Sequence, residues 1–328
     1  MAQRFLVTGG AGFVGSHLVA ALLDRGDEVT VLDNLRTGHR AAVPAGAGLV
    51  VADLAEAAPL DTLLGTGTWD AVFHFAALSQ VGESMRMPMR YLLDNAANGI
   101  RLIDACVRHG VPRFVLSSTA ALFNLDSAEP IPEDAPIDPQ SAYGDSKWML
   151  ERALRWAGQV HGLRSACLRY FNAAGADPAG RLGEDHRPES HLVPLVIDAA
   201  LGRRPALDVY GDDYPTPDGT CIRDYVHVSD LATAHLLAAE ALNDGPVVWN
   251  LGSGTGHSVR QVIAAVQHVS GLEVPYRVTA RRPGDAAILI ASSASARQAG
   301  WRPIHGALDD IVRTAFTWRQ SHPGGYGD

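Results

Sequence analysis

The first half of the chain alternates short apolar segments with stretches of helical periodicity, and this alternation restricts the possible folds most strongly. The apolar segments are hydrophobic throughout, so both faces of each predicted strand should be covered. Strands of this kind that are separated by helices are typical of a parallel sheet with helices on both sides. The sequence therefore predicts a doubly wound α/β domain. The predicted strands are residues 4–9, 28–33, 48–54, 71–78, 113–118 and 164–171, and the helices between them include residues 16–26 and 91–109.

The second half of the chain differs from the first in composition and regularity, and the change begins at about residue 175. Residues 175–190 and 210–220 are rich in Pro, Gly and Asp, and irregular segments of this length are usually functional. We therefore expect a first domain of residues 1–175 and a smaller mixed domain of residues 176–328, some of whose elements return to the main sheet. Its predicted helices and strand are residues 228–242, 259–270 and 247–254.

Composition and charge argue against several classes of protein. The formal net charge of −9 over 328 residues does not suit sequence-independent binding of nucleic acid, which needs a basic surface. No apolar run reaches the length of a membrane span, and because the first predicted strand begins at residue 4 without a signal-peptide pattern before it, we expect no secretion signal. Three separated cysteines fit a reducing compartment, and we expect a cytoplasmic protein. Because no Cys-x-x-Cys occurs and the 13 histidines are scattered, we expect no metal site.

A glycine-rich turn follows the first predicted strand. Gly9, Gly12 and Gly15 lie between this strand and a helix, which is the context in which such a turn binds a dinucleotide. Glycines let the backbone approach a pyrophosphate closely, and the N–H groups at the start of the helix favour an anion. We expect Phe13 and Val14, within the turn, to share this role. A tight turn without a ligand is the alternative interpretation.

The second predicted strand ends at Asp33, 18 residues after Gly15. A carboxylate at this position can accept hydrogen bonds from both hydroxyls of the adenosine ribose, and it would repel a 2′-phosphate. The sequence therefore predicts NAD in preference to NADP, although Asp33 could instead simply cap the following loop. Asp53 and Leu54 end the third predicted strand and are suitably placed to meet the adenine.

The segment SAYGDSKWM holds Tyr143 and Lys147, which would point the same way on a helix. Taken alone, the pair could equally be one turn of a surface helix. The ammonium group should favour phenolate and lower the pKa of Tyr143, which could then act as a general base toward a sugar hydroxyl, while Lys147 could hold the nicotinamide ribose. Ser117, Ser118 and Thr119 end the preceding strand, at the edge where doubly wound folds bind ligands. The Thr119 hydroxyl could bind the substrate oxygen and relay its proton to Tyr143.

Several motifs together resemble the extended short-chain dehydrogenase/reductase family. They are TGGAGFVGSH, Asp33-Asn34, HFAA (74–77), SST (117–119), Tyr143-x-x-x-Lys147 and RYFNAAG (169–175). Later segments are similar to the UDP-glucose 4-epimerases of that family, namely VGES, GEDHRPESHLVPLV, YGDDYPTPDGTCIRDYVHVSDLA and RRPGD. The resemblance covers essentially the whole chain. It implies a Rossmann domain for NAD in the first half and a nucleotide-sugar domain in the second.

The resemblance also implies an activity. Tyr143 would remove the proton of the sugar 4-hydroxyl while hydride leaves C4 for the nicotinamide of tightly bound NAD. The 4-keto sugar would turn about its bond to the diphosphate, and hydride would return to the opposite face. UDP-galactose and UDP-glucose would thus interconvert without consuming an external oxidant. The site must stay closed during this cycle, because loss of the keto sugar would strand NADH.

Binding residues follow from the same resemblance. In the second half, Asn172 would contact the diphosphate, and Arg223 and Arg282 would clamp it, because a guanidinium fork pairs bidentately with phosphate oxygens. Asp285 would accept a ribose hydroxyl of the uridine. Without the resemblance, these arginines would be read as surface ion-pair residues. The residues expected to line the NAD groove are Asn34, Phe75, Ala76, Ala77, Asn95, Ser117, Ser118 and Tyr170.

Two departures from the family pattern bear on the sugar. The family usually has Val-Tyr-Gly where this chain has Leu122, Phe123 and Asn124, which could alter sugar contacts or loop geometry. Leu289, four residues after Asp285, aligns where the family varies between a bulky aromatic and a smaller residue beside the sugar 2-position. Leucine leaves intermediate room, so N-acetylated sugars could fit.

Other functions stay open. A 4,6-dehydratase would have Asp-Glu where this chain has Ala120-Ala121 after Thr119, so that activity loses its acid and base. A 4-epimerase for another UDP-sugar (an N-acetylhexosamine, a pentose or a uronate) would keep the same catalytic residues. A dinucleotide-binding protein without catalysis is a further alternative. The resemblance also implies a homodimer, formed by helices near residues 91–109 and 142–158.

Overall fold

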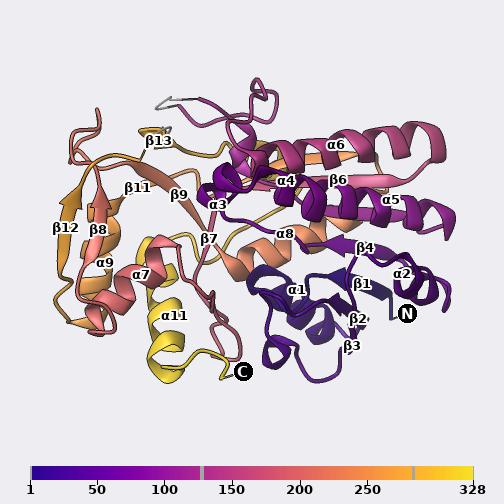
Figure 1. Cartoon of the computed structure of the whole chain (residues 1–328), viewed down its shortest axis with the longest axis horizontal. Coiled ribbons are helices and arrows are strands. Elements are labelled where there is room, and N and C mark those ends of the chain that lie inside the picture. Colours follow the sequence, from indigo (N-terminus) through magenta and orange to yellow (C-terminus); the bar gives the residue numbers. More distant parts are fainter. Residues whose placement is uncertain (1, 126–128, 283–284, 328) are drawn as a thin grey trace.

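The structure is a computed structural model that describes residues 2–125, 129–282 and 285–327, and a seven-stranded parallel sheet forms its centre (Figure 1). The strands are β1 (Arg4–Thr8), β2 (Glu28–Asp33), β3 (Gly48–Val51), β4 (Ala71–His74), β5 (Arg113–Ser117), β6 (Arg164–Tyr170) and β10 (Val247–Leu251). Their order across the sheet is β10-β6-β5-β4-β1-β2-β3. It reverses between β1 and β4, the kind of switch point at which such folds bind ligands. The predicted doubly wound fold is therefore confirmed.

Helices cover both faces of this sheet. One face carries α1 (Phe13–Asp24) and α8 (Val228–Ala241), and the other carries α2 (Ala57–Leu64), α5 (Asn98–Arg108) and α6 (Ala142–His161). Phe5 and Val7 of β1 pack in one core with Leu22 of α1, while Leu6 packs in the other core with Leu150 of α6. Successive residues of the strand thus enter opposite cores, which explains why the strand is apolar throughout.

The helix predicted at residues 91–109 is divided. It consists of α4 (Pro88–Tyr91), a π-helical turn η2 (Leu92–Ala97) and α5, and it follows the short helix α3 (Val81–Arg86). A π-helical turn inside an α-helix is uncommon and is frequent at functional sites. The sequence pattern does not reveal such a turn, because the helices before and after it keep the apolar periodicity of a single helix.

The second half of the chain builds a smaller unit around a core that includes Val196, Ile197, Val262, Ile263 and Ile311. Its helices are α7 (Leu192–Ala200), α9 (Val259–Ser270) and α11 (Leu308–Ser321). Its strands are β7 (Asn172–Ala174), β8 (Leu207–Tyr210), β9 (Ile222–His227), β11 (Gly256–Ser258), β12 (Tyr276–Thr279) and β13 (Ile288–Leu289). The remaining short helices are η1 (Arg40–Ala42), η3 (Ala120–Leu122) and α10 (Ala294–Gln298).

Two elements of the second half return to the main sheet: one is a strand of it, and the other is a helix that covers it. Strand β10 pairs in parallel with β6, and α8 packs against α1 on one face. Within the described residues, no helix has both the length and the apolar character that a membrane span requires.

Candidate functional site

The glycine turn between β1 and α1 has the geometry of a phosphate site. Gly9 has a φ of +75°, and a Cβ there would lie 2.4 Å from the backbone nitrogen of Ala76. Gly12 is the N-cap of α1 and provides no side-chain cap, so the first backbone N–H groups, those of Phe13 and Val14, can serve an anion. A Cβ at Gly15 would collide with the carbonyl oxygen of Gly9, at 2.2 Å. The turn therefore fits a dinucleotide pyrophosphate.

Asp33 and Asn34 sit beside this turn at the end of β2. One carboxylate oxygen of Asp33 accepts the backbone N–H of Ala11 at 3.0 Å and the other accepts that of Leu35 at 2.9 Å. Burial raises the pKa of Asp33, and these two hydrogen bonds oppose the rise. The Asn34 amide donates to Asp53 Oδ2 at 2.8 Å. Asp33 thus braces the turn as well as offering a carboxylate, and its contact with the adenosine ribose stays a prediction.

Tyr143, Lys147 and Thr119 come together where β5 ends and α6 begins. The Thr119 side chain accepts the backbone N–H of Ala121 at 3.1 Å and lies close enough to the Tyr143 phenol to influence its pKa. Lys147 Nζ donates to the carbonyl oxygen of Ser117 at 2.8 Å. Tyr143 and Lys147 are both buried. The sequence prediction placed these three residues together, and the structure does so as well.

The protonation of this trio differs from the sequence argument. Burial raises the pKa of Tyr143, with the Thr119 hydrogen bond opposing the rise. Burial also lowers the pKa of Lys147 to about 8, against the pull of Glu151. The prediction that Lys147 lowers the pKa of Tyr143 is therefore wrong for this structure, because desolvation of the phenolate dominates. The phenol retains its proton at neutral pH here.

Aromatic side chains line the sheet edge near this trio. The Tyr170 phenol and the Ser117 hydroxyl are 2.5 Å apart. The rings of Phe75 and Tyr170 lie 4.7 and 6.2 Å from that of His235. Ala76 and Ala77 follow Phe75 where the chain leaves β4.

Two residues predicted to bind the cofactor, Asn95 and Leu54, are buried and contact other residues of the protein. The Asn95 side chain, in the π-helical turn, accepts the backbone N–H of Leu78 at 2.8 Å and donates to its carbonyl oxygen at 2.9 Å. It also donates to the Ser146 hydroxyl at 3.1 Å. Leu54 packs in the apolar core beside Leu60. Both residues are buried, and their roles in cofactor binding stay predictions.

A buried ion pair behind the trio of Tyr143, Lys147 and Thr119 was not predicted from the sequence. Arg169 Nη2 lies 2.7 Å from Glu151 Oε2, and both side chains are almost fully buried. Arg169 also donates to the Glu133 carbonyl oxygen at 2.9 Å. The Ser118 hydroxyl donates to Glu151 Oε1 at 2.6 Å. Ser118 was expected to line the NAD groove, but its hydroxyl proton is used by the ion pair. Glu151 lies one helical turn after Lys147, a spacing that could have suggested its place.

The residues expected to bind the nucleotide sugar lie together in the second unit. The Asn172 amide donates to the Asp224 carbonyl oxygen at 3.0 Å. Arg223 forms an ion pair with Asp285, as the alternative interpretation of these residues expected. The Arg282 guanidinium lies 3.8 Å from the centre of a tyrosine ring, that of Tyr210. The structure thus brings the predicted residues to one region, while their contacts with a nucleotide sugar stay predictions. The middle of the RRPGD motif, residues 283–284, lies outside the described residues.

Of the residues 122–124 that depart from the family pattern, the first two are buried and Asn124 is exposed. Phe123 is buried with Phe171 and partly buried Leu289, and the Arg169 guanidinium lies 5.7 Å from its ring centre. The Asn124 amide donates to Asp138 Oδ2 at 3.0 Å. The position of Asn124 does not require glycine, since Leu35 is the one non-glycine residue with positive φ in the described ranges.

Comparison with known proteins agrees with this arrangement. The sequence model of the NAD dependent epimerase/dehydratase family matches residues 5–252. A UDP-glucose 4-epimerase of Azospirillum brasilense is 49% identical over 97% of this chain and 92% of its own length. One of Halalkalibacterium halodurans is 47% identical over 99% of this chain and 98% of its own.

The same relationship holds in three dimensions. The crystal structure of UDP-glucose 4-epimerase from Brucella ovis in complex with NAD has a TM-score of 0.93 and 43% identity, over 96% of this chain and 98% of that chain. The family resemblance found in the sequence is thereby confirmed. The chain belongs to the NAD dependent epimerase/dehydratase family, whose cofactor is NAD.

Proposed function

We propose that this protein is a UDP-glucose 4-epimerase that interconverts UDP-galactose and UDP-glucose through a 4-keto sugar. The observation that carries the proposal is the meeting of Tyr143, Thr119 and Lys147 beside a dinucleotide turn. The identity with known UDP-glucose 4-epimerases over nearly the whole chain supports it.

The chain's own residues account for the proton transfers. In the filled site Tyr143 acts as the phenolate: it takes the proton of the sugar 4-hydroxyl and returns it to the 4-oxygen once the keto sugar has turned over. Thr119, which lies beside Tyr143, holds the substrate oxygen and keeps the two groups aligned. Lys147 is held at the Ser117 carbonyl oxygen, where its positive charge favours the phenolate once the site is filled. Bound NAD supplies a hydride acceptor that becomes the hydride donor in the return step.

Arg223, Arg282 and Asp285 are proposed to hold the UDP group. Because Arg223 pairs with Asp285 in the structure, binding of the diphosphate would exchange a carboxylate for phosphate oxygens. Asp285 would then be released to accept a ribose hydroxyl. We propose that residues 1–175, completed by β10 and α8, bind NAD, and that most of residues 176–328 bind the nucleotide sugar.

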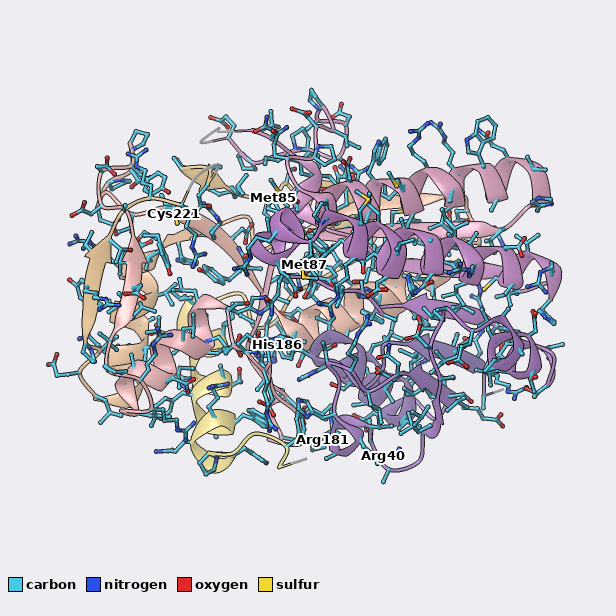
Figure 2. The ribbon with its side chains drawn as sticks, viewed as in Figure 1. Arg40, Met85, Met87, Arg181, His186 and Cys221 are labelled. Atoms are coloured by element: carbon cyan, nitrogen blue, oxygen red, sulfur yellow. The ribbon has the colours of Figure 1, made fainter. Side chains whose placement is uncertain are left out.

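We also propose that the protein is a cytoplasmic homodimer. The helices named by the family resemblance, together with the segment of α3 and α4 just before the first of them, carry a group of exposed apolar side chains, and association would bury them. Met85 and Met87 of this group are labelled in Figure 2. The group consists of Met85, Met87, Met89, Leu93, Ile100, Met149, Trp156 and Val160. The cysteines are free thiols, which suits a reducing compartment.

The activity can be tested directly. The protein is purified without added NAD and incubated with UDP-galactose, and the anomeric signals are followed by proton NMR. We expect conversion to UDP-glucose without added cofactor. Failure to convert UDP-galactose after addition of NAD would contradict the proposal, and the same assay on UDP-pentoses and UDP-uronates would then identify the substrate.

Leu289 is expected to set the room beside the sugar 2-position. Leu289→Tyr should reduce turnover of UDP-N-acetylgalactosamine more than that of UDP-galactose, by about 10-fold or more, because a larger side chain would clash with the acetamido group. Leu289→Met, which nearly conserves volume, serves as the control. The measurement is kcat/KM for both sugars, and an equal loss on both would rule out this role.

A further inference from the structure

A cluster of two histidines and two glutamates lies in the segment before α7, outside the site described above. Glu184, His186, Glu189 and His191 each offer one ligand atom, and these atoms all lie within 4.8 Å of one another. In Figure 2, His186 lies near the centre of the molecule, and its ring meets that of Phe13 edge-on at 6.4 Å. Two of the 13 histidines, His186 and His191, therefore meet two carboxylates here.

The convergence centres on one buried carboxylate oxygen. His186 Nδ1 lies 3.2 Å from Glu184 Oε1, and His191 Nδ1 contacts the same oxygen closely. His186 Nδ1 also lies 3.6 Å from Glu189 Oε1, and the two imidazole rings are 5.0 Å apart. Two imidazole nitrogens aimed at one carboxylate must either both carry protons or share another cation.

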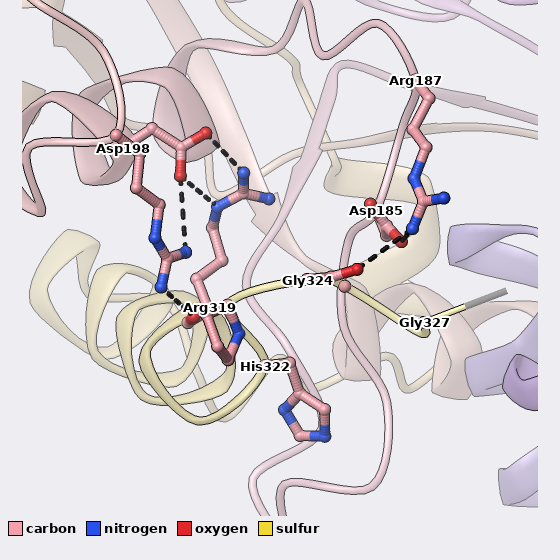
Figure 3. Close-up of a pocket in the computed structure, with 10 residues that line it drawn as sticks. Asp185, Arg187, Asp198, Arg319, His322, Gly324 and Gly327 are labelled. Atoms are coloured by element: carbon pink, nitrogen blue, oxygen red, sulfur yellow. Dashed lines mark hydrogen bonds and ion pairs between the residues drawn. The ribbon is translucent and has the colours of Figure 1, made fainter.

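Glu189 adds an unused ligand atom. Its Oε2 is enclosed and accepts no hydrogen bond from any described residue. Arg319 Nη1 lies 3.9 Å away, but this guanidinium is already held by Asp198 through contacts of 3.0 and 2.5 Å, drawn in Figure 3. A buried carboxylate oxygen without a donor is costly unless a cation meets it.

A divalent ion would balance the charges of this cluster. The two carboxylates carry two negative charges, which one divalent cation would offset. The same ion could coordinate both imidazoles through the nitrogens that point at Glu184 Oε1, together with both carboxylates.

We propose that Glu184, His186, Glu189 and His191 form a structural site for a divalent transition-metal ion such as Zn²⁺. Nitrogen and carboxylate ligands suit this class of ion, and four protein ligands are typical of a closed structural site. The ion would fix the segment that precedes α7 against Phe13 at the start of α1. The site is independent of the proposed activity, since none of its residues is assigned to the reaction.

The test is a titration of the full-length protein without a histidine tag. The protein is first stripped with a chelator, and ZnCl₂ is then added at pH 7.5 with calorimetric detection. We expect one Zn²⁺ per chain, a higher Tm, and the visible absorption of tetrahedral Co²⁺ when that ion is used instead.

Ligand variants locate the ion. The double variant with His186→Gln and His191→Gln should lose at least the ~10–100-fold in affinity that removal of an outer-shell partner costs. Glu184→Gln offers a second variant of nearly unchanged shape. His268→Gln is the matched control, since His268 also pairs with a carboxylate, Asp309 at 2.9 Å, but lies exposed on α9.

Two results would overturn the site. One is the absence of saturable Zn²⁺ binding by the wild-type chain, and the other is equal affinity in the double variant and the wild type. Neither result depends on any UDP-sugar, so they leave the proposed epimerase activity to its own assay.

Discussion

Tyr143→Phe is expected to reduce kcat for UDP-galactose by about 10²–10⁴-fold, the usual contribution of a general acid–base group. The phenylalanine ring should keep the packing of Tyr143 against Leu78 and Tyr91, so folding should be preserved. Binding of UDP, measured by calorimetry, should change little, because the phenol is expected to act on the sugar and not on the nucleotide. The kinetic measurement is kcat and KM from the NMR assay.

Tyr91→Phe is the matched control for this substitution. The Tyr91 phenol donates to Glu83 at 2.8 Å and its ring meets that of Tyr143 at 6.4 Å, so the variant removes a nearby hydroxyl outside the trio. We expect its kcat to stay within a few-fold of wild type. If Tyr143→Phe kept a tenth of the wild-type kcat, or if both variants lost equally, Tyr143 would not be the proton-transfer group.

Glu151→Gln is expected to lower the free energy of unfolding by about 3–5 kcal/mol, because it leaves the buried Arg169 charge without its partner. The effect should be seen as a lower urea midpoint with an unchanged slope. The hydrogen bond from Ser118 should weaken as well, which adds to the loss.

Asp104→Asn provides the comparison with an exposed pair. Asp104 and Arg108 form an ion pair of similar length, 2.9 Å, on the surface of α5, where such a pair contributes roughly 0.3–0.5 kcal/mol. Replacing both Glu151 and Arg169 by Met should recover most of the stability that the single variant loses. If Glu151→Gln lowered the free energy of unfolding as little as Asp104→Asn does, the buried ion pair would not stabilise the fold as proposed.

Sequence patterns predicted the first half well, because its strands are buried on both faces and its turns carry glycine. The predicted ends were less accurate. Strand β4 stops at His74 and not at residue 78, since Phe75 and the two alanines after it leave the sheet toward the dinucleotide turn. Most strands of the second half are only two to four residues long, too short to show a period.

The site was predictable where it depends on motifs and unpredictable where it depends on burial. Tyr143, Lys147 and Thr119 could be related because helix spacing and strand ends fix their positions. The pKa of Tyr143 was predicted with the wrong sign because the sequence does not report how deeply the phenol is buried. The Glu151–Arg169 pair joins a helix to a strand, and that neighbourhood exists only once α6 packs beside β6.

The position of β10 has a consequence for synthesis of the protein. A ribosome releases β6 long before residues 247–251, so the β6 edge of the nascent sheet stays open while most of the second unit is being made. The face of α1 that α8 later covers is also exposed during this interval. The seven-stranded sheet is therefore completed only after much of the smaller unit of the second half has been translated.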